Sequence, residues 1–111
     1  LRQLLDRLYL GVRQDNSRQL AQSVQGSLLR SLRKINPHLE DRGIKPAPFV
    51  VLLSTEMPAV LAEVSCLSNE DEASLLAKPL YRQFIAEALA EGVQSYADLL
   101  AQAPQDPEKG I

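Results

Sequence analysis

Few residues in this 111-residue sequence are of the types that perform chemistry, since it contains one histidine, His38, and one cysteine, Cys66. A third candidate is Glu63, a carboxylate that ends an apolar run and is followed by small polar residues and a new helix start. Taken alone, Glu63 is interpreted as a structural carboxylate that caps the next helix or pairs with Arg42 or Lys45. Its place at the end of a buried segment still raises the question of a chemical role.

The histidine and the cysteine favour structural interpretations. A lone cysteine is usually a small core residue, and Cys66 has no partner for a disulfide bond within the chain. A nucleophilic cysteine needs a base, and the nearest candidate, His38, follows a proline in a predicted loop. We interpret His38 as a solvated loop residue and the acidic run 70–72 as the start of a helix rather than a metal site.

These residues must be positioned by the elements around them, and the first third of the chain predicts two helices. The stretch 1–12 carries an apolar stripe with helical spacing, and a second stripe follows over 17–35. Between the stripes lie Asp15, Asn16 and Ser17, which are typical N-cap residues. We therefore predict that one helix ends near these residues and that another begins there.

Two short apolar runs in the centre of the chain predict β-strands. They cover 49–54 and 59–64, and their continuous apolar character is typical of central strands with both faces covered. Their connection is too short for a helical crossover, so they are antiparallel neighbours or lie apart in a larger sheet. Two strands cannot form such a sheet alone, and we expect the remaining strands upstream of this chain.

Two further helices are predicted after the strands. Ser68 or Asn69 can cap the first, and Pro79 suits the first turn of the second, which has the clearest apolar stripe in the chain. The order α-α-β-β-α-α predicts part of an α/β domain. We place this portion at 1–103 and a flexible, proline-rich tail at 104–111.

The composition excludes several classes of protein. The net charge is −2 and no basic patch stands out, so the sequence does not predict a nucleic-acid partner. No apolar run approaches the roughly 18 residues of a membrane span. The first residues have none of the features of a signal peptide and no initiator Met, so we expect the chain to be cut from a longer protein.

Four segments together resemble one known family, the zinc-dependent N-acetylmuramoyl-L-alanine amidases called Amidase_3, and specifically its C-terminal half. They occur in the order of the family and span 16–101. The matching segments are "SRQLAQSVQGSLLRSL", "DRGIKPAPFVVL", "MPAVLAEVSCLSNEDEASLL" and "YRQFIAEALAEGVQSY". Four ordered matches are far more specific than any single motif.

The resemblance implies a mixed sheet flanked by helices, and a hydrolase that cuts the amide bond between N-acetylmuramic acid and L-alanine in peptidoglycan. It assigns Glu63 to the family's catalytic Glu, a general acid/base beside a zinc-bound water. It also matches Arg42 to a family Arg, so Arg42 either lines the substrate cleft or forms an ordinary salt bridge. This chain has Ser65-Cys66 where the family has Gly-Phe, which changes the turn after Glu63.

The resemblance also implies zinc ligands that this chain lacks. The family binds zinc through two His and a Glu in its N-terminal half, whereas this chain has one histidine. A catalytic zinc site takes three protein ligands, so we expect the chain alone to be inactive. The parent protein is then an amidase in the cell envelope, and the alternative is a non-catalytic module that binds peptidoglycan or a regulatory protein partner. A weaker third alternative is a purely structural fragment.

Overall fold

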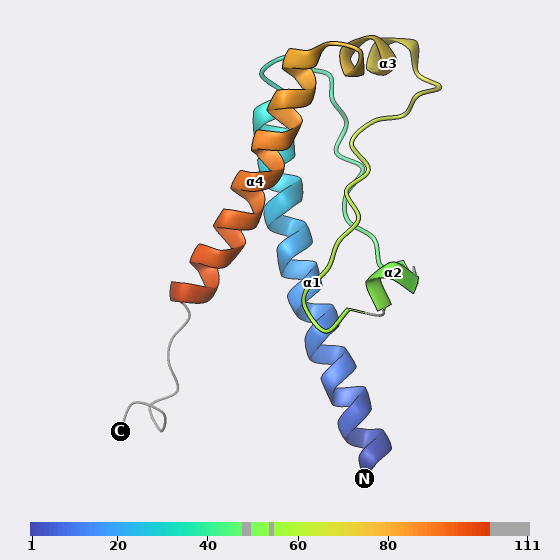
Figure 1. Cartoon of the computed structure of the whole chain (residues 1–111), viewed down its shortest axis with the longest axis vertical. Helices are drawn as coiled ribbons and strands as arrows, with labels where there is room; N and C mark the ends of the chain where they lie inside the picture. Colours follow the sequence, from blue (N-terminus) through green and yellow to red (C-terminus); the bar gives the residue numbers. More distant parts are fainter. Residues whose placement is uncertain (48–49, 54, 103–111) are drawn as a thin grey trace.

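The computed structural model describes residues 1–47, 50–53 and 55–102, apart from the side chains of residues 9, 10, 51 and 53. The helices in these residues are, in chain order, α1 (Arg2–Leu32), α2 (Val50–Leu53), α3 (Glu70–Leu76) and α4 (Pro79–Gln102). The long helices α1 and α4 pack side by side and diverge toward the N-terminal end of α1 (Figure 1). The short helix α3 packs against α4.

The first helix is continuous, so the predicted break at Asp15, Asn16 and Ser17 is wrong. Each of these residues costs at most about 0.7 kcal/mol in a helix interior, and no glycine or proline interrupts the chain there. The Ser17 hydroxyl does not cap a helix but accepts a hydrogen bond from the Ala59 N–H. The two apolar stripes therefore belong to one helix.

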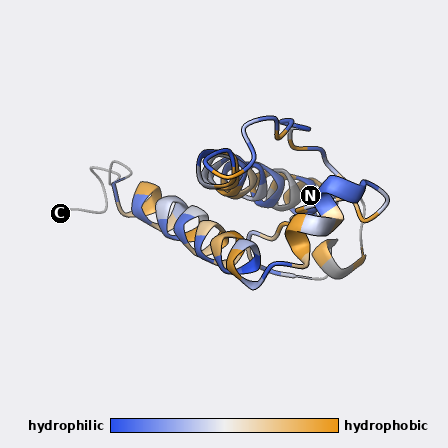
Figure 2. Cartoon of the chain, turned by 90° about the horizontal axis from the view of Figure 1, so that it is seen from above, coloured by the Kyte–Doolittle hydropathy of each residue, from blue (hydrophilic) through white to orange (hydrophobic). Residues whose placement is uncertain are grey.

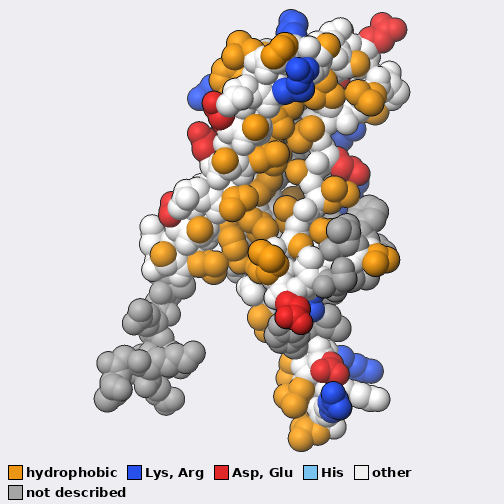
Figure 3. Space-filling view, viewed as in Figure 1, with side chains coloured by type: hydrophobic (Ala, Val, Ile, Leu, Met, Phe, Trp, Pro, Cys, Tyr) orange, Lys and Arg blue, Asp and Glu red, His pale blue; other side chains and the backbone are white. Residues whose placement is uncertain are grey.

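The hydrophobic core is the seam between α1 and α4. Both helices carry polar and apolar residues (Figure 2), and apolar side chains gather along the seam in the space-filling view (Figure 3). The apolar stripe of each helix thereby covers that of the other. The buried apolar residues are Leu20, Val24, Leu28 and Leu32 of α1, and Tyr81, Ile85, Ala88 and Tyr96 of α4.

Two small residues set the closest approach of these helices. A Cβ atom on Gly92 of α4 would lie 2.6 Å from the Cα of Val24, so only glycine fits there. Nearby, the buried Ser27 hydroxyl of α1 donates a 2.6 Å hydrogen bond to the Ala88 carbonyl of α4. This bond satisfies the one polar side chain found buried in the described part of the seam.

The predicted α/β fold is wrong, because the described residues contain helices and no strand. Helix α2 occupies the centre of the predicted strand 49–54, whose end residues lie outside the described part of the chain. The second predicted strand, 59–64, is extended but belongs to no sheet. A strand needs a neighbour for its backbone hydrogen bonds, and these two runs find none in the described chain. The predicted tail at 104–111 lies outside the described residues.

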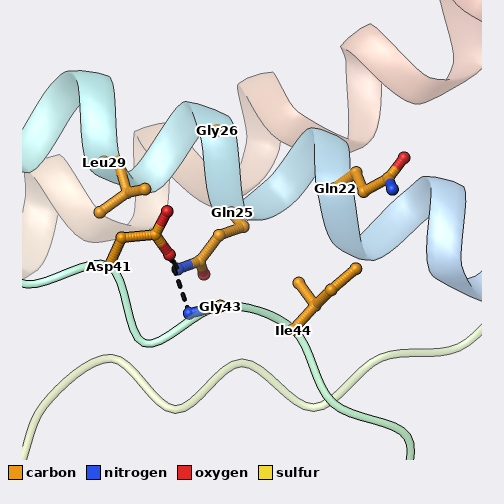
Figure 4. Close-up of a pocket in the computed structure, with 7 residues that line it drawn as sticks. All are labelled: Gln22, Gln25, Gly26, Leu29, Asp41, Gly43 and Ile44. Carbon is orange, nitrogen blue, oxygen red and sulfur yellow. Dashed lines mark hydrogen bonds between the residues drawn. The ribbon is translucent and has the colours of Figure 1, made fainter.

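Two extended segments instead run beside α1. Segment 40–47 descends to α2, and segment 58–66 returns toward α3 (Figure 1). The close-up in Figure 4 also shows two chain segments running side by side next to α1. Leu39, just before the first segment, and Val60 and Val64 of the second pack against the helical core. None of the described helices has the length and apolar character that crossing a bilayer demands.

Candidate functional site

Glu63 lies on the extended segment 58–66 with its side chain exposed. Exposure alternates along this segment: Val60, Ala62 and Val64 are half-buried, whereas Leu61 and Glu63 are exposed. Such a period of two is the signature of extended backbone, in which successive side chains point to opposite faces. Glu63 therefore faces away from the helical core, and its carboxylate can reach a molecule outside it.

Two side chains from the helices hold the ends of this segment. At one end, the Ala59 N–H donates to the Ser17 Oγ of α1 at 3.1 Å. At the other end, the Cys66 N–H donates to Glu72 Oε2 of α3 at 2.8 Å. Both bonds satisfy backbone donors that a neighbouring strand would satisfy in a sheet.

A turn and a cap follow the segment directly. The Asn69 N–H donates to the Cys66 carbonyl at 3.1 Å, and the Asn69 side chain accepts from the Glu72 N–H at 3.1 Å. Asn69 is thus the N-cap of α3, which confirms one of the two predicted cap residues and excludes Glu63 from that role. The acidic run 70–72 forms the first turn of α3, as predicted.

Cys66 is half-buried in this turn, and its thiol contacts a serine hydroxyl. Its Sγ lies 2.9 Å from the Ser68 Oγ, and this hydrogen bond is the main reason that the pKa of the Cys66 thiol lies below its ordinary value. His38 is exposed in the turn after α1. No hydrogen bond between Cys66 and His38 is found among the described residues, so the structure assembles no cysteine–histidine pair.

The loop that carries Arg42 is held by the preceding residue. Asp41 Oδ1 accepts from Gln25 Nε2 at 2.9 Å and from the Gly43 N–H at 2.8 Å, and Gly43 has a positive φ of 73°. The hydrogen bond from Gln25, followed by that from Gly43 and the charge of Arg33, lowers the pKa of the Asp41 carboxyl. Asp41 therefore fixes the loop through hydrogen bonds rather than through a salt bridge to Arg42.

Arg42 itself is exposed, and the described residues show no ion pair between it and Asp41, Glu40 or Glu63. A pocket of about 310 Å³ opens next to it between α1 and the loop (Figure 4). Asp41 and Gln25 meet in this pocket, whereas neither Arg42 nor Glu63 lines it. Its lining residues are Gln22, Gln25, Gly26, Leu29, Asp41, Gly43 and Ile44.

A zinc site does not fit the described residues. No group of three or more His, Cys, Asp or Glu side chains able to hold a metal ion occurs in the described ranges. The single histidine, His38, is exposed and has no such group around it. Since a catalytic zinc needs three protein ligands, this part of the chain does not supply its coordination.

The family of the chain is shown by a comparison with protein-family models. The model described as Amidase_3, N-acetylmuramoyl-L-alanine amidase, matches residues 8–95, most of the chain. The chain belongs to this family. The matched residues include Glu63, Arg42 and both anchors of the segment that carries Glu63.

Individual relatives agree with membership of the Amidase_3 family. A Bacillus subtilis protein printed as "Uncharacterized protein YqiI" is 38% identical over 84 residues, which are 76% of this chain and 38% of that protein. The Escherichia coli N-acetylmuramoyl-L-alanine amidase AmiA is 48% identical over 67 residues, covering 59% of this chain and 23% of AmiA. The Bacillus subtilis amidase LytC is 36% identical over 81 residues, covering 73% of this chain and 15% of LytC.

The matched part of the chain therefore spans 38% or less of the length of these three relatives. No solved structure is a significant match to it. The resemblance inferred from the sequence is confirmed at the level of the family. Whether the chain corresponds to the C-terminal half of the domain stays a prediction.

Sequence reasoning missed the anchoring roles of Ser17 and Glu72. Ser17 was interpreted as a helix cap, and nothing in its surroundings indicates a bond to a residue 42 positions away. Glu72 carried a clearer signal, because a Glu three residues after Asn69 is the spacing of a capping box. In the structure its carboxylate accepts from the Cys66 N–H rather than from the cap residue.

Proposed function

We propose that this chain is the C-terminal portion of the catalytic domain of a peptidoglycan amidase. The observation that carries the proposal is that an Amidase_3 match includes Glu63, whose carboxylate is exposed on an anchored extended segment. The reaction is hydrolysis of the amide between N-acetylmuramic acid and L-alanine, and the protein acts at the cell envelope. We place the zinc ligands outside these 111 residues, and the chain alone is then inactive.

In this role Glu63 acts as general acid and base. Its carboxylate removes a proton from the attacking water as the water oxygen bonds to the amide carbonyl carbon. The carbon–nitrogen bond then breaks, and Glu63 delivers the proton to the departing amine. The exposed position of Glu63 supports this assignment, because both reactants must reach the carboxylate. We propose Arg42, which is also exposed, as a substrate contact.

Glu63→Gln in the whole protein tests this role. The amide side chain cannot accept the proton, so release of peptides from purified peptidoglycan should fall by about 100-fold or more. Glu56→Gln is a matched control, since Glu56 is exposed on the connection before the same segment and should leave the rate unchanged. In the same assay, Arg42→Ala should raise KM. Wild-type activity of Glu63→Gln would remove Glu63 from the mechanism.

A second candidate function is a peptidoglycan-binding module without chemistry. It is favoured by one observation, the lack of a metal-ligating group among the described residues. The two functions differ in what the whole protein does with purified peptidoglycan. A module would sediment with the polymer, contain no stoichiometric zinc and release no peptides, whereas the amidase would release them.

A further inference from the structure

The segment that carries Glu63 is extended but has no strand neighbour in the described chain. In a sheet, ladder hydrogen bonds fix how a strand sits along its neighbour, and a shift by one residue turns every side chain to the opposite face. The same shift here would turn Glu63 toward α1 and α4. Within the described chain, hydrogen bonds outside a ladder therefore hold the register of residues 59–66.

At the Cys66 end, the anchor is Glu72, whose own position is fixed by the core. Its N–H is held by the Asn69 cap, and the following residues Leu75 and Leu76 pack against the hydrophobic core. Tyr81 of α4 is 3% exposed, and its pKa is raised by burial and, secondarily, by the charge of Glu72. Glu72 thus lies in the first turn of a short helix that packs against α4 through its last residues.

At the Ala59 end, the anchor is Ser17 on α1. It lies one turn before Leu20, the first buried residue among the described side chains of that helix, and is itself half-buried. Its hydroxyl accepts from the Ala59 N–H across 42 residues of sequence. Both ends of the segment are therefore tied to side chains on rigid helices, and Val60 and Val64 fill the space between the ties.

We propose that Ser17 and Glu72 are positioning residues for Glu63, which hold the two ends of its segment in one register so that the carboxylate faces outward. This inference rests on the proposed function of Glu63. Ser17 and Glu72 touch no reacting atom, and each acts through a backbone N–H. Loss of either hydrogen bond leaves the Glu63 carboxylate chemically unchanged. The carboxylate then occupies several positions instead of one.

Amide hydrogen exchange in the 111-residue chain tests the ties directly. Glu72→Ala should speed exchange of the Cys66 amide, and Ser17→Ala that of the Ala59 amide, each by at least about tenfold, because exchange reports local opening. Glu70→Ala is the matched control, since Glu70 lies in the same first turn of α3 without contacting Cys66. Unchanged exchange at Cys66 in Glu72→Ala, or at Ala59 in Ser17→Ala, would overturn the proposal.

Kinetic measurements on the whole protein then distinguish a misplaced Glu63 from a loss of folding stability. Glu72→Ala and Ser17→Ala should lower kcat by up to about 100-fold with little change in KM, because misplacement of a catalytic group affects the transition state. The conservative variants Glu72→Gln and Ser17→Thr keep an acceptor oxygen and should restore most of kcat. Circular dichroism should show that the helix content of each variant is unchanged. Where an alanine variant fails to fold, its conservative variant is measured in its place.

The outcomes distinguish this inference from the proposed function. If Glu63→Gln is inactive while Glu72→Ala and Ser17→Ala keep the wild-type kcat, positioning is overturned and the role of Glu63 stands. If Glu63→Gln is fully active, the proposed catalytic role of Glu63 fails, and the positioning role fails with it. If kcat falls equally in the alanine and the conservative variants, the effect is structural and the inference is wrong.

Discussion

The helical pair and the extended segments of this chain differ in how fully their backbone hydrogen bonds are made within the element itself. In α1 and α4, backbone hydrogen bonds close within each helix, and the two apolar stripes cover one another. Segments 40–47 and 58–66 lie side by side, yet no backbone hydrogen bond joins them in the described chain. Three of their backbone N–H groups, those of Gly43, Ala59 and Cys66, donate instead to side chains. The acceptors are Asp41, Ser17 and Glu72.

The apolar stripes of the helical pair are covered within the chain, whereas segment 58–66 leaves one face uncovered. One face of segment 58–66 is packed on the helices, while Leu61 on the other face is 54% exposed next to Glu63. The outward face of this segment, which carries the candidate catalytic carboxylate, is thus left uncovered by the described helices. The packed pair of α1 and α4 thus supports the segment 58–66, which carries Glu63.

The largest expected effect is on the seam of the helical pair. Leu32 is 2% exposed at the end of α1, so Leu32→Ala removes buried methyl groups and leaves a cavity. The free energy of unfolding should fall by about 2–5 kcal/mol, measured by urea denaturation. Leu99→Ala is the matched control, because Leu99 is 59% exposed on α4 and its loss should change stability by less than about 0.5 kcal/mol. Equal effects of the two substitutions would show that the seam is not the core.

A smaller effect is expected where the two helices approach most closely. Gly92→Ala places a methyl group 2.6 Å from the Cα of Val24, and a backbone atom cannot yield without moving α1. Overpacking of this kind should cost about 1–3 kcal/mol.

Gly11→Ala provides the opposite case in the other long helix, α1. Nothing lies within 4 Å of a Cβ at Gly11, and alanine in a helix interior is favoured by about 0.5–1 kcal/mol over glycine. Thermal unfolding should therefore show a lower Tm for Gly92→Ala and a higher Tm for Gly11→Ala. A raised Tm in Gly92→Ala would contradict the close packing of the helices.

The helices were predictable because their information is local. The stripe of α4, its start at Pro79 and the Asn69 cap of α3 all follow from spacing and residue type, and the structure confirms them. The break in α1 was predicted wrongly, since cap-forming residues at 15–17 are also tolerated inside a helix. A local signal can mark where a helix is able to begin, but it does not show that the preceding helix has ended.

The sheet was predicted wrongly for a physical reason that lies outside the chain's local pattern. The runs 49–54 and 59–64 have strand-like composition, but a strand forms only with a neighbour. The outward direction of Glu63 could have been predicted from its odd spacing relative to Val60 and Val64. The ties from Ser17 and Glu72 could not, because they depend on how distant elements pack.

The smallest expected effect concerns the other extended segment and its dependence on pH. The lowered pKa of Asp41 means that the folded loop favours the carboxylate over the acid. The two hydrogen bonds to Asp41 therefore contribute fully above its unfolded pKa of about 3.9, and their contribution is lost as the pH falls through the lower folded value. In an NMR titration, the Gly43 amide should move upfield with a midpoint below the ordinary value of 3.8.

Asp41→Asn sharpens this last test, because it keeps an acceptor oxygen for Gln25 and Gly43 but removes the titrating proton. The Gly43 amide should then show no titration in the acid range, while the helical pair unfolds at the same urea concentration as in the wild type. A titration that also changes the Ser27 or Gly92 amides would show that the loop and the seam are coupled. Independent behaviour would mean that segment 40–47 can rearrange around a fixed helical pair.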